Sequence, residues 1–165
     1  MTAQASDTVV YSGSLYSICG VAGHGLFQPG DYDIEPVAIS TACWRGFVVG
    51  YEICDDFLCV SKLAIGLSPQ DALRAKSKEG VEVLGQRLKV RTKQPILSGD
   101  FGFDGAQERI RFTGGLLLGA DFVQDLYVHM GFHPAWKYRR VHELQFIDGP
   151  VSYTHLRAHE TNSNR

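Results

Sequence analysis

Three side chains of the sequence could carry out acid–base chemistry. Histidine exchanges a proton near neutral pH, and His129 is the candidate of that type. Glu52 and Glu143 lie within apolar stretches, where a carboxylate must be hydrogen-bonded or protonated to be tolerated. If His129 met either glutamate in a cleft, the two could act as general acid and base. The structural alternative is that the glutamates face solvent or pair with Arg45, Arg139 or Arg140.

Two adjacent residues, Trp44 and Arg45, are the candidate ligand-binding residues. In an enzyme, the guanidinium of Arg45 could bind an anion beside the acid–base residues.

The histidines and cysteines do not form a metal-binding pattern. His129 and His133 have the spacing of two ligands on one helical turn, but Gly131 and Pro134 interrupt a helix there. The four cysteines include no Cys-x-x-Cys pair and, without an export signal, are expected to be free thiols. A Gly-x-Gly-x-x-Gly order for binding a dinucleotide is also missing. We therefore expect no metal and no cofactor.

A β-hairpin between residues 45 and 65 would position Glu52. Apolar residues alternate with others on both sides of an Asp-Asp pair, which suits a turn. If the loop has two residues, Tyr51 lies opposite Val60 and Glu52 lies opposite Cys59.

The rest of the chain predicts further strands and two short helices. Strands are expected at 9–19 (one strand, or two short ones broken near Gly13), 86–92 (an edge strand), 110–118 and 138–147. A loop is expected at 20–36, and helices at 72–78 and 122–130. Ser68 would cap the first helix and Asp121 the second. The second helix would bury one stripe formed by Phe122, Val123, Leu126 and Met130. The fold class is therefore α+β: a mainly antiparallel sheet, open or a partial barrel, that closes over this helix.

Composition indicates a globular protein and disfavours two kinds of partner. The chain has 165 residues, 44% of them hydrophobic, and a formal net charge of −2. Such a balance offers no field that attracts nucleic acid or an anionic membrane, and the apolar runs are too short to span a bilayer. With no basic and apolar leader at the N-terminus, the expected location is the cytoplasm.

The last segment does not continue the strand pattern. Residues 150–161, PVSYTHLRAHET, resemble the translated sequencing-adapter read-through at the ends of metagenome-derived reading frames. We therefore expect one globular domain over 1–149, followed by an artefactual, non-native tail over 150–165, without a partner strand for 138–147.

Two stretches together resemble a family of uncharacterised, conserved-hypothetical bacterial proteins. They are TACWRGFVVGYEI (41–53), and FTGGL (112–116) followed by YVHMGF (127–132) and Glu143-Leu144. The resemblance implies a small, β-rich cytosolic protein and carries over no catalytic residue or cofactor.

The leading functional hypothesis is a non-catalytic binding or interaction domain of a cytosolic bacterial protein. Its partner would be a protein or a small molecule, and the sequence does not define the oligomeric state. The alternative is a small enzyme that uses His129 with Glu143 and Glu52.

Overall fold

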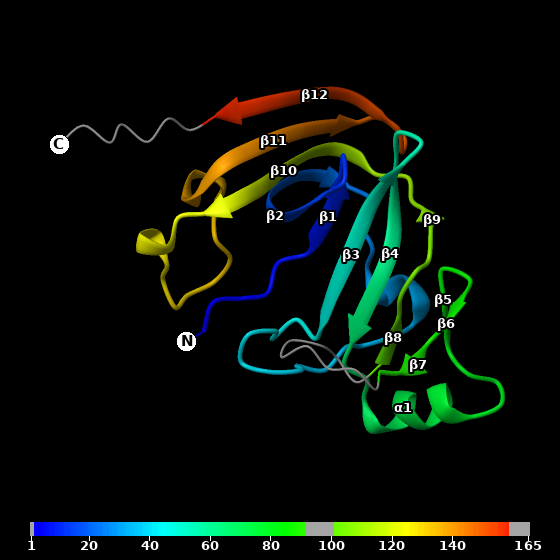
Figure 1. Ribbon diagram of the computed structural model, residues 1–165. Helices are drawn as coiled ribbons and strands as arrows, with labels where there is room; N and C mark the ends of the chain where they lie inside the picture. The colour runs from blue at the N-terminus through cyan, green and yellow to red at the C-terminus, as the bar shows by residue number, and fades with distance from the viewer. Residues whose placement is uncertain (1, 92–100, 159–165) are drawn as a thin grey trace.

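Tight turns build two hairpins at the centre of the computed structural model, which describes residues 2–91 and 101–158 (Figure 1). The first hairpin joins β1 (Thr8–Tyr11) to β2 (Ser14–His24). Its turn residues, Ser12 and Gly13, have φ angles of 48° and 77°. Positive φ at both central positions is what a type I′ turn requires, and this turn matches the twist of the strands. The predicted break near Gly13 is confirmed.

The hairpin predicted between residues 45 and 65 is confirmed together with its register. Its strands are β3 (Phe47–Cys54) and β4 (Phe57–Ile65). The two aspartates between them have φ angles of 49° and 66°, again the type I′ requirement. Tyr51 pairs with Val60, and Glu52 pairs with Cys59.

These hairpins belong to a ten-stranded sheet in the order β12-β11-β10-β2-β1-β3-β4-β8-β7, with β9 paired to β4. The remaining strands of the sheet are β7 (Lys89–Val90), β8 (Phe101–Phe103), β9 (Glu108–Arg109), β10 (Thr113–Phe122), β11 (Tyr138–Phe146) and β12 (Val151–Ala158). A separate two-stranded sheet contains β5 (Glu82–Val83) and β6 (Gln86–Arg87). The strand predicted over 86–92 is thus divided between β6 and the edge strand β7, and Thr92 lies outside the described residues.

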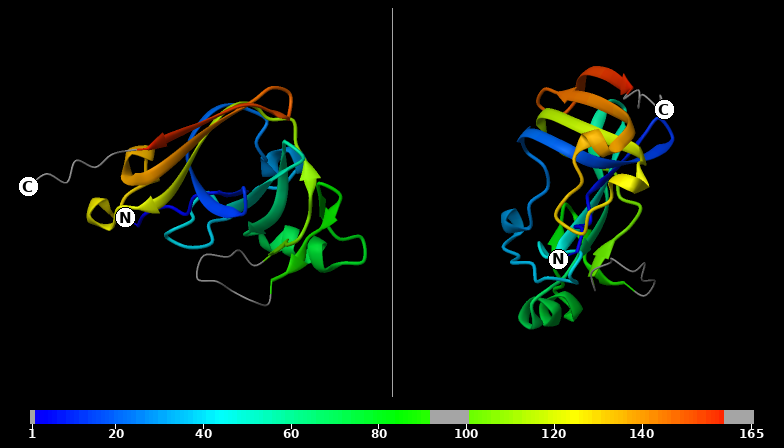
Figure 2. Two further views of the ribbon diagram at one scale, coloured as in Figure 1. Left: turned by 45° about the horizontal axis from the view of Figure 1, so that its top comes forward. Right: turned by 90° about the vertical axis from the view of Figure 1, so that its left-hand side faces the viewer.

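One strand pair makes the sheet mixed rather than antiparallel throughout. β1 runs parallel to β3, with Thr8, Val9 and Val10 opposite residues 50–52. The parallel pair forms where the two hairpins meet through their first strands. The prediction of antiparallel pairing is confirmed for the other strand pairs. The sheet is open and strongly curved (Figure 2).

The first predicted helix is confirmed as α1 (Pro69–Lys76), the one α-helix of the described residues. The Ser68 hydroxyl accepts a hydrogen bond from the Asp71 backbone N–H at 3.1 Å, and a proline occupies the first turn. The helix begins three residues before the predicted range of 72–78 and ends two residues before its end, with Ser77 as the C-terminal cap.

The second predicted helix, 122–130, is wrong. β10 continues to Phe122, and only a short 3₁₀ turn, η2 (Gln124–Leu126), follows. Pairing with β11 explains the difference: Asp121 binds Arg140 Nε at 2.6 Å instead of capping a helix, and the Phe122 ring packs against Tyr138. The predicted buried stripe is consequently absent, and the Met130 side chain is exposed.

The loop predicted over 20–36 begins later than expected. β2 extends to His24 because glycines let it approach β10 closely; a Cβ on Gly114 would lie 2.0 Å from the Ala22 carbonyl oxygen. The irregular part then contains the 3₁₀ turn η1 (Pro29–Tyr32).

The segment after Gly149 forms a strand, contrary to the expectation that β11 lacks a partner. β12 pairs antiparallel with β11, and the Val151 N–H donates to the Asp56 carbonyl at 2.7 Å. Residues 159–165 of the predicted tail lie outside the described residues. The non-native origin of 150–165 stays a prediction.

One hydrophobic core joins both ends of the curved sheet. Its largest fully buried side chains are Tyr51, Phe112, Phe146, Leu58, Leu63, Ile65, Leu88, Leu116, Leu118, Leu144, Val9 and Val49. In 2–91 and 101–158, none of the helices has the length and apolar character needed to cross a bilayer.

Replacing Gly114 with alanine should lower the free energy of unfolding by about 1–3 kcal/mol, because the new methyl group would collide with β2 backbone and the φ angle is 140°. Urea unfolding monitored by circular dichroism measures the change. Gly30→Ala is the matched control, since no atom lies within 4 Å of its added carbon. Equal stability of the two variants would contradict close strand packing at Gly114.

Candidate functional site

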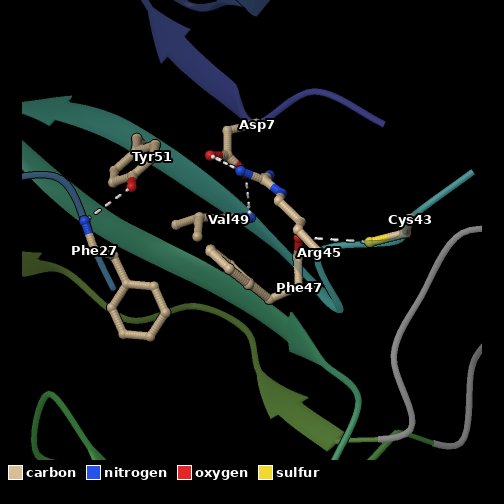
Figure 3. Close-up of polar contacts among 7 residues, drawn as sticks. All are labelled: Asp7, Phe27, Cys43, Arg45, Phe47, Val49 and Tyr51. Atoms are coloured by element: carbon tan, nitrogen blue, oxygen red, sulfur yellow. Dashed lines mark hydrogen bonds and ion pairs between the residues drawn. The ribbon is translucent and has the colours of Figure 1, made fainter. Parts of the chain in front are cut away.

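An ion pair between Asp7 and Arg45 joins the start of β1 to the loop before β3 (Figure 3). The guanidinium forms two hydrogen bonds to the carboxylate: Nη1 to Oδ2 at 3.1 Å, and Nη2 to Oδ1. The Val49 backbone N–H also donates to Oδ1, at 2.7 Å. Asp7 is 12% exposed and Arg45 31% exposed, so the pair is largely shielded from water. A paired geometry of this kind fixes the plane of the guanidinium.

Aromatic rings hold the same guanidinium from other directions. Its carbon lies 4.6 Å from the centroid of the Phe47 ring and 5.8 Å from that of Phe132. The Phe47 carbonyl accepts a hydrogen bond from the Cys43 thiol at 3.5 Å, which ties the loop before β3 to the strand (Figure 3). Arg45 is therefore a rigid feature rather than a mobile surface arginine.

The ion pair forms the polar end of a pocket of about 260 Å³. The pocket lies between β2, the segment that leads into β1, and the loop that follows η2. Its lining residues are Ser6, Asp7, Ile18, Cys19, Gly20, Val21, Arg45 and Phe132. Val21 and Phe132 are about half exposed and lie at the rim, whereas Ile18 is buried. A mainly apolar wall with a few polar groups at one end is typical of a small-molecule site, and this volume suits a small ligand.

Burial dominates the electrostatics around the pocket. It raises the pKa of the Asp7 carboxyl, although Arg45 and the Val49 N–H act in the opposite direction. It also raises the pKa of the Tyr51 hydroxyl, which accepts a hydrogen bond from the Phe27 N–H at 3.2 Å (Figure 3). In the pocket wall, burial raises the pKa of the Cys19 thiol from 9.0 to about 11. This thiol donates a hydrogen bond to the Leu117 carbonyl at 3.3 Å.

The three acid–base candidates come from separate elements. His129 is exposed on the loop after η2, where its Nδ1 lies 3.4 Å from the Tyr127 hydroxyl oxygen. Glu143, on β11, accepts a hydrogen bond from the Gln145 side chain and lines a depression on β2, β10 and β11. Neither His129 nor Glu52 lines that depression, so it does not unite the three. Glu52 lies on β3 beside Cys59 of β4.

Of the two ligand-binding candidates, Arg45 lines the pocket and Trp44 does not. Trp44 is exposed, and its backbone N–H donates to the Gln4 side chain at 3.0 Å. The expectation that Arg45 could neutralise a strand glutamate is corrected, since its carboxylate partner is Asp7. In the described part of the chain, no group of three or more His, Cys, Asp and Glu side chains is arranged to hold a metal ion.

Sequence reasoning missed Asp7 and Phe132 as site residues. Asp7 precedes a strand with no local pattern that marks it, and its partner is 38 residues away. Phe132 ends the YVHMGF stretch, and nothing in that stretch marks it as a residue near Arg45. Comparison of the chain with protein families, curated proteins and solved structures gives no match.

Asp7→Ala should lower the free energy of unfolding by about 3–5 kcal/mol, because it leaves a shielded guanidinium and the Val49 N–H without their acceptor. Chemical denaturation measures the change. Arg74→Ala, which breaks the more exposed pair with Asp71, should cost no more than about 1 kcal/mol. Similar losses in both variants would mean that the Asp7 pair contributes no more than a surface pair.

The Cys19 thiol should react with iodoacetamide roughly 100-fold more slowly at pH 8 in the folded protein than in urea, because its pKa is about 11 instead of 9.0 and the thiolate is the nucleophile. A raised pKa keeps the thiol protonated below about pH 11, so the rate should increase about tenfold per pH unit from 8 to 10. Mass spectrometry of the peptide that contains Cys19 follows the reaction, and the same peptide in urea is the control. Equal rates at pH 8 would contradict a buried, hydrogen-bonded thiol.

Proposed function

We propose that this protein is a non-catalytic binding domain whose ligand is a small molecule with an apolar body and a polar end. The pocket beside the Asp7–Arg45 pair carries the proposal, since apolar side chains and a fixed polar group converge there. Ile18, Val21 and Phe132 would contact the apolar body. The ion pair would orient the polar end.

The chemistry of the pocket supports binding rather than catalysis. The charged groups that line it are paired with each other, so neither is poised to accept or deliver a proton. The potential nucleophile, Cys19, has a raised pKa and is therefore protonated at neutral pH.

A cytosolic, bacterial setting and the absence of nucleic-acid or membrane partners remain part of this proposal. The near-neutral charge balance supports the exclusion of nucleic-acid and anionic-membrane partners, and the family resemblance of residues 41–53 and 127–132 supports the bacterial, cytosolic setting. A protein partner in place of a small molecule is less well supported, since the recessed ion pair offers few atoms to a flat protein surface.

The neutral fluorescent probe N-phenyl-1-naphthylamine should bind the protein with an increase in emission, because the pocket wall is mainly apolar. Phe132→Ala should weaken probe binding about fivefold or more, since it removes an aromatic wall. Met130→Ala is the matched control, being an exposed apolar residue of the same loop that does not line the pocket.

A second variant tests the same site by filling the pocket instead of removing part of its wall. Ser6→Phe adds a ring at another residue that lines the pocket and should also reduce probe binding. A probe affinity that is the same in wild type, Phe132→Ala and Ser6→Phe would place binding elsewhere and refute the proposed site.

A further inference from the structure

The Asp7–Arg45 pair has hydrogen-bonding capacity that its own contacts do not use. A guanidinium has five N–H donors, and two of them bind Asp7. The Arg45 Nε atom is buried and has no hydrogen-bond partner among the described residues. Because Nε is buried, a ligand in the pocket does not reach it. The Arg45 side chain is nevertheless 31% exposed, and each Nη atom carries a second N–H that Asp7 does not occupy.

The carboxylate retains acceptor capacity as well. Two donors, Arg45 Nη2 and the Val49 N–H, share Oδ1, whereas Oδ2 receives one donor, Arg45 Nη1. Because each carboxylate oxygen can accept about two hydrogen bonds, Oδ2 can accept one more. The polar end of the pocket thus presents donors and an acceptor on neighbouring atoms.

The charge of the pocket restricts the ligand further. Asp7 and Arg45 neutralise each other, and the other lining residues are uncharged. A ligand carboxylate would approach the Asp7 carboxylate, and a ligand ammonium would approach the guanidinium. Either ion would also enter a mainly apolar recess without a counter-charge of its own, which is costly.

We propose that the pocket recognises neutral amides: primary carboxamides, lactams or ureas in which a carbonyl lies next to an N–H. This inference rests on the proposed binding function. The carbonyl oxygen accepts from the second N–H of Arg45 Nη1, the atom that binds Oδ2. The ligand N–H donates to Oδ2 of Asp7, and the apolar substituent packs against Ile18 and Phe132. An amide fits because it supplies one acceptor and one donor on adjacent atoms without net charge.

Four ligands of nearly equal size test this recognition: benzamide, acetophenone, benzoate and benzylamine. Acetophenone keeps the carbonyl of benzamide but replaces its amino group with a methyl group. Benzoate and benzylamine carry a negative and a positive charge. Their dissociation constants are measured by displacement of N-phenyl-1-naphthylamine from the wild-type protein and by ligand-observed NMR, which needs no probe.

Benzamide should bind at least tenfold more tightly than each of the other three, because each competitor leaves a polar group of the pair without a partner or brings in a charge. Asp7→Asn keeps one side-chain oxygen and should bring benzamide and acetophenone within about threefold of each other. Circular dichroism verifies that this variant is folded; if it is not, the comparison of the four ligands on the wild-type protein alone decides the question.

The two proposals fail in different ways. If acetophenone or benzoate binds as tightly as benzamide while Phe132→Ala still weakens the probe, amide recognition is wrong and the binding function stands. If none of the four ligands binds and the probe is insensitive to Phe132→Ala and Ser6→Phe, both proposals are wrong.

Discussion

The parallel contact between β1 and β3 is the constraint on which the rest of the structure depends. In the described sheet, β1 is the strand that joins the half containing β2 and β10 to the half containing β3 and β4. Its ladder to β3 covers three residue pairs, from Thr8 to Val10. Asp7 extends this short ladder, because its carboxylate accepts the next β3 donor, the Val49 N–H, while it binds Arg45. A side chain thus continues the strand pairing where the backbone pairing stops.

The pocket lies just beyond the point where the pairing between β1 and β2 stops, at Thr8 and Ser17. β2 remains paired with β10 as far as His24. The residues before Thr8 are not part of the ladder between β1 and β2. Gln4 and Ala5 donate instead to the carbonyls of Gly131 and Ala42. The pocket lies between these two paths, and the ion pair and Phe132 belong to its lining. Fold and site are therefore one feature: strands that diverge from a single hydrogen-bonded carboxylate.

Local chemistry accounts for what the sequence predicts correctly, and distant pairing accounts for the rest. Two-residue turns define the register of the β3–β4 hairpin, and Ser68 defines the start of α1, because each depends on neighbours in the chain. Asp121 has the same local appearance as a helix cap, yet the Arg140 side chain on β11 binds it and the strand continues. The sequence offers Arg45 as a candidate binding residue but not Asp7, since the contact between Asp7 and Arg45 depends on a parallel strand pair that no local pattern encodes.

The physics that stabilises this site also limits its chemistry. Burial raises the pKa values of Cys19, Cys43 and Tyr51, so each of these groups is neutral at physiological pH. Burial likewise opposes the charge on Asp7, and the carboxylate is tolerated because Arg45 and a backbone N–H bind it. Catalytic groups need the reverse arrangement, with an ionisable side chain left unpaired and poised near neutral pH. The described pocket lacks such a group, and this supports the proposed binding function.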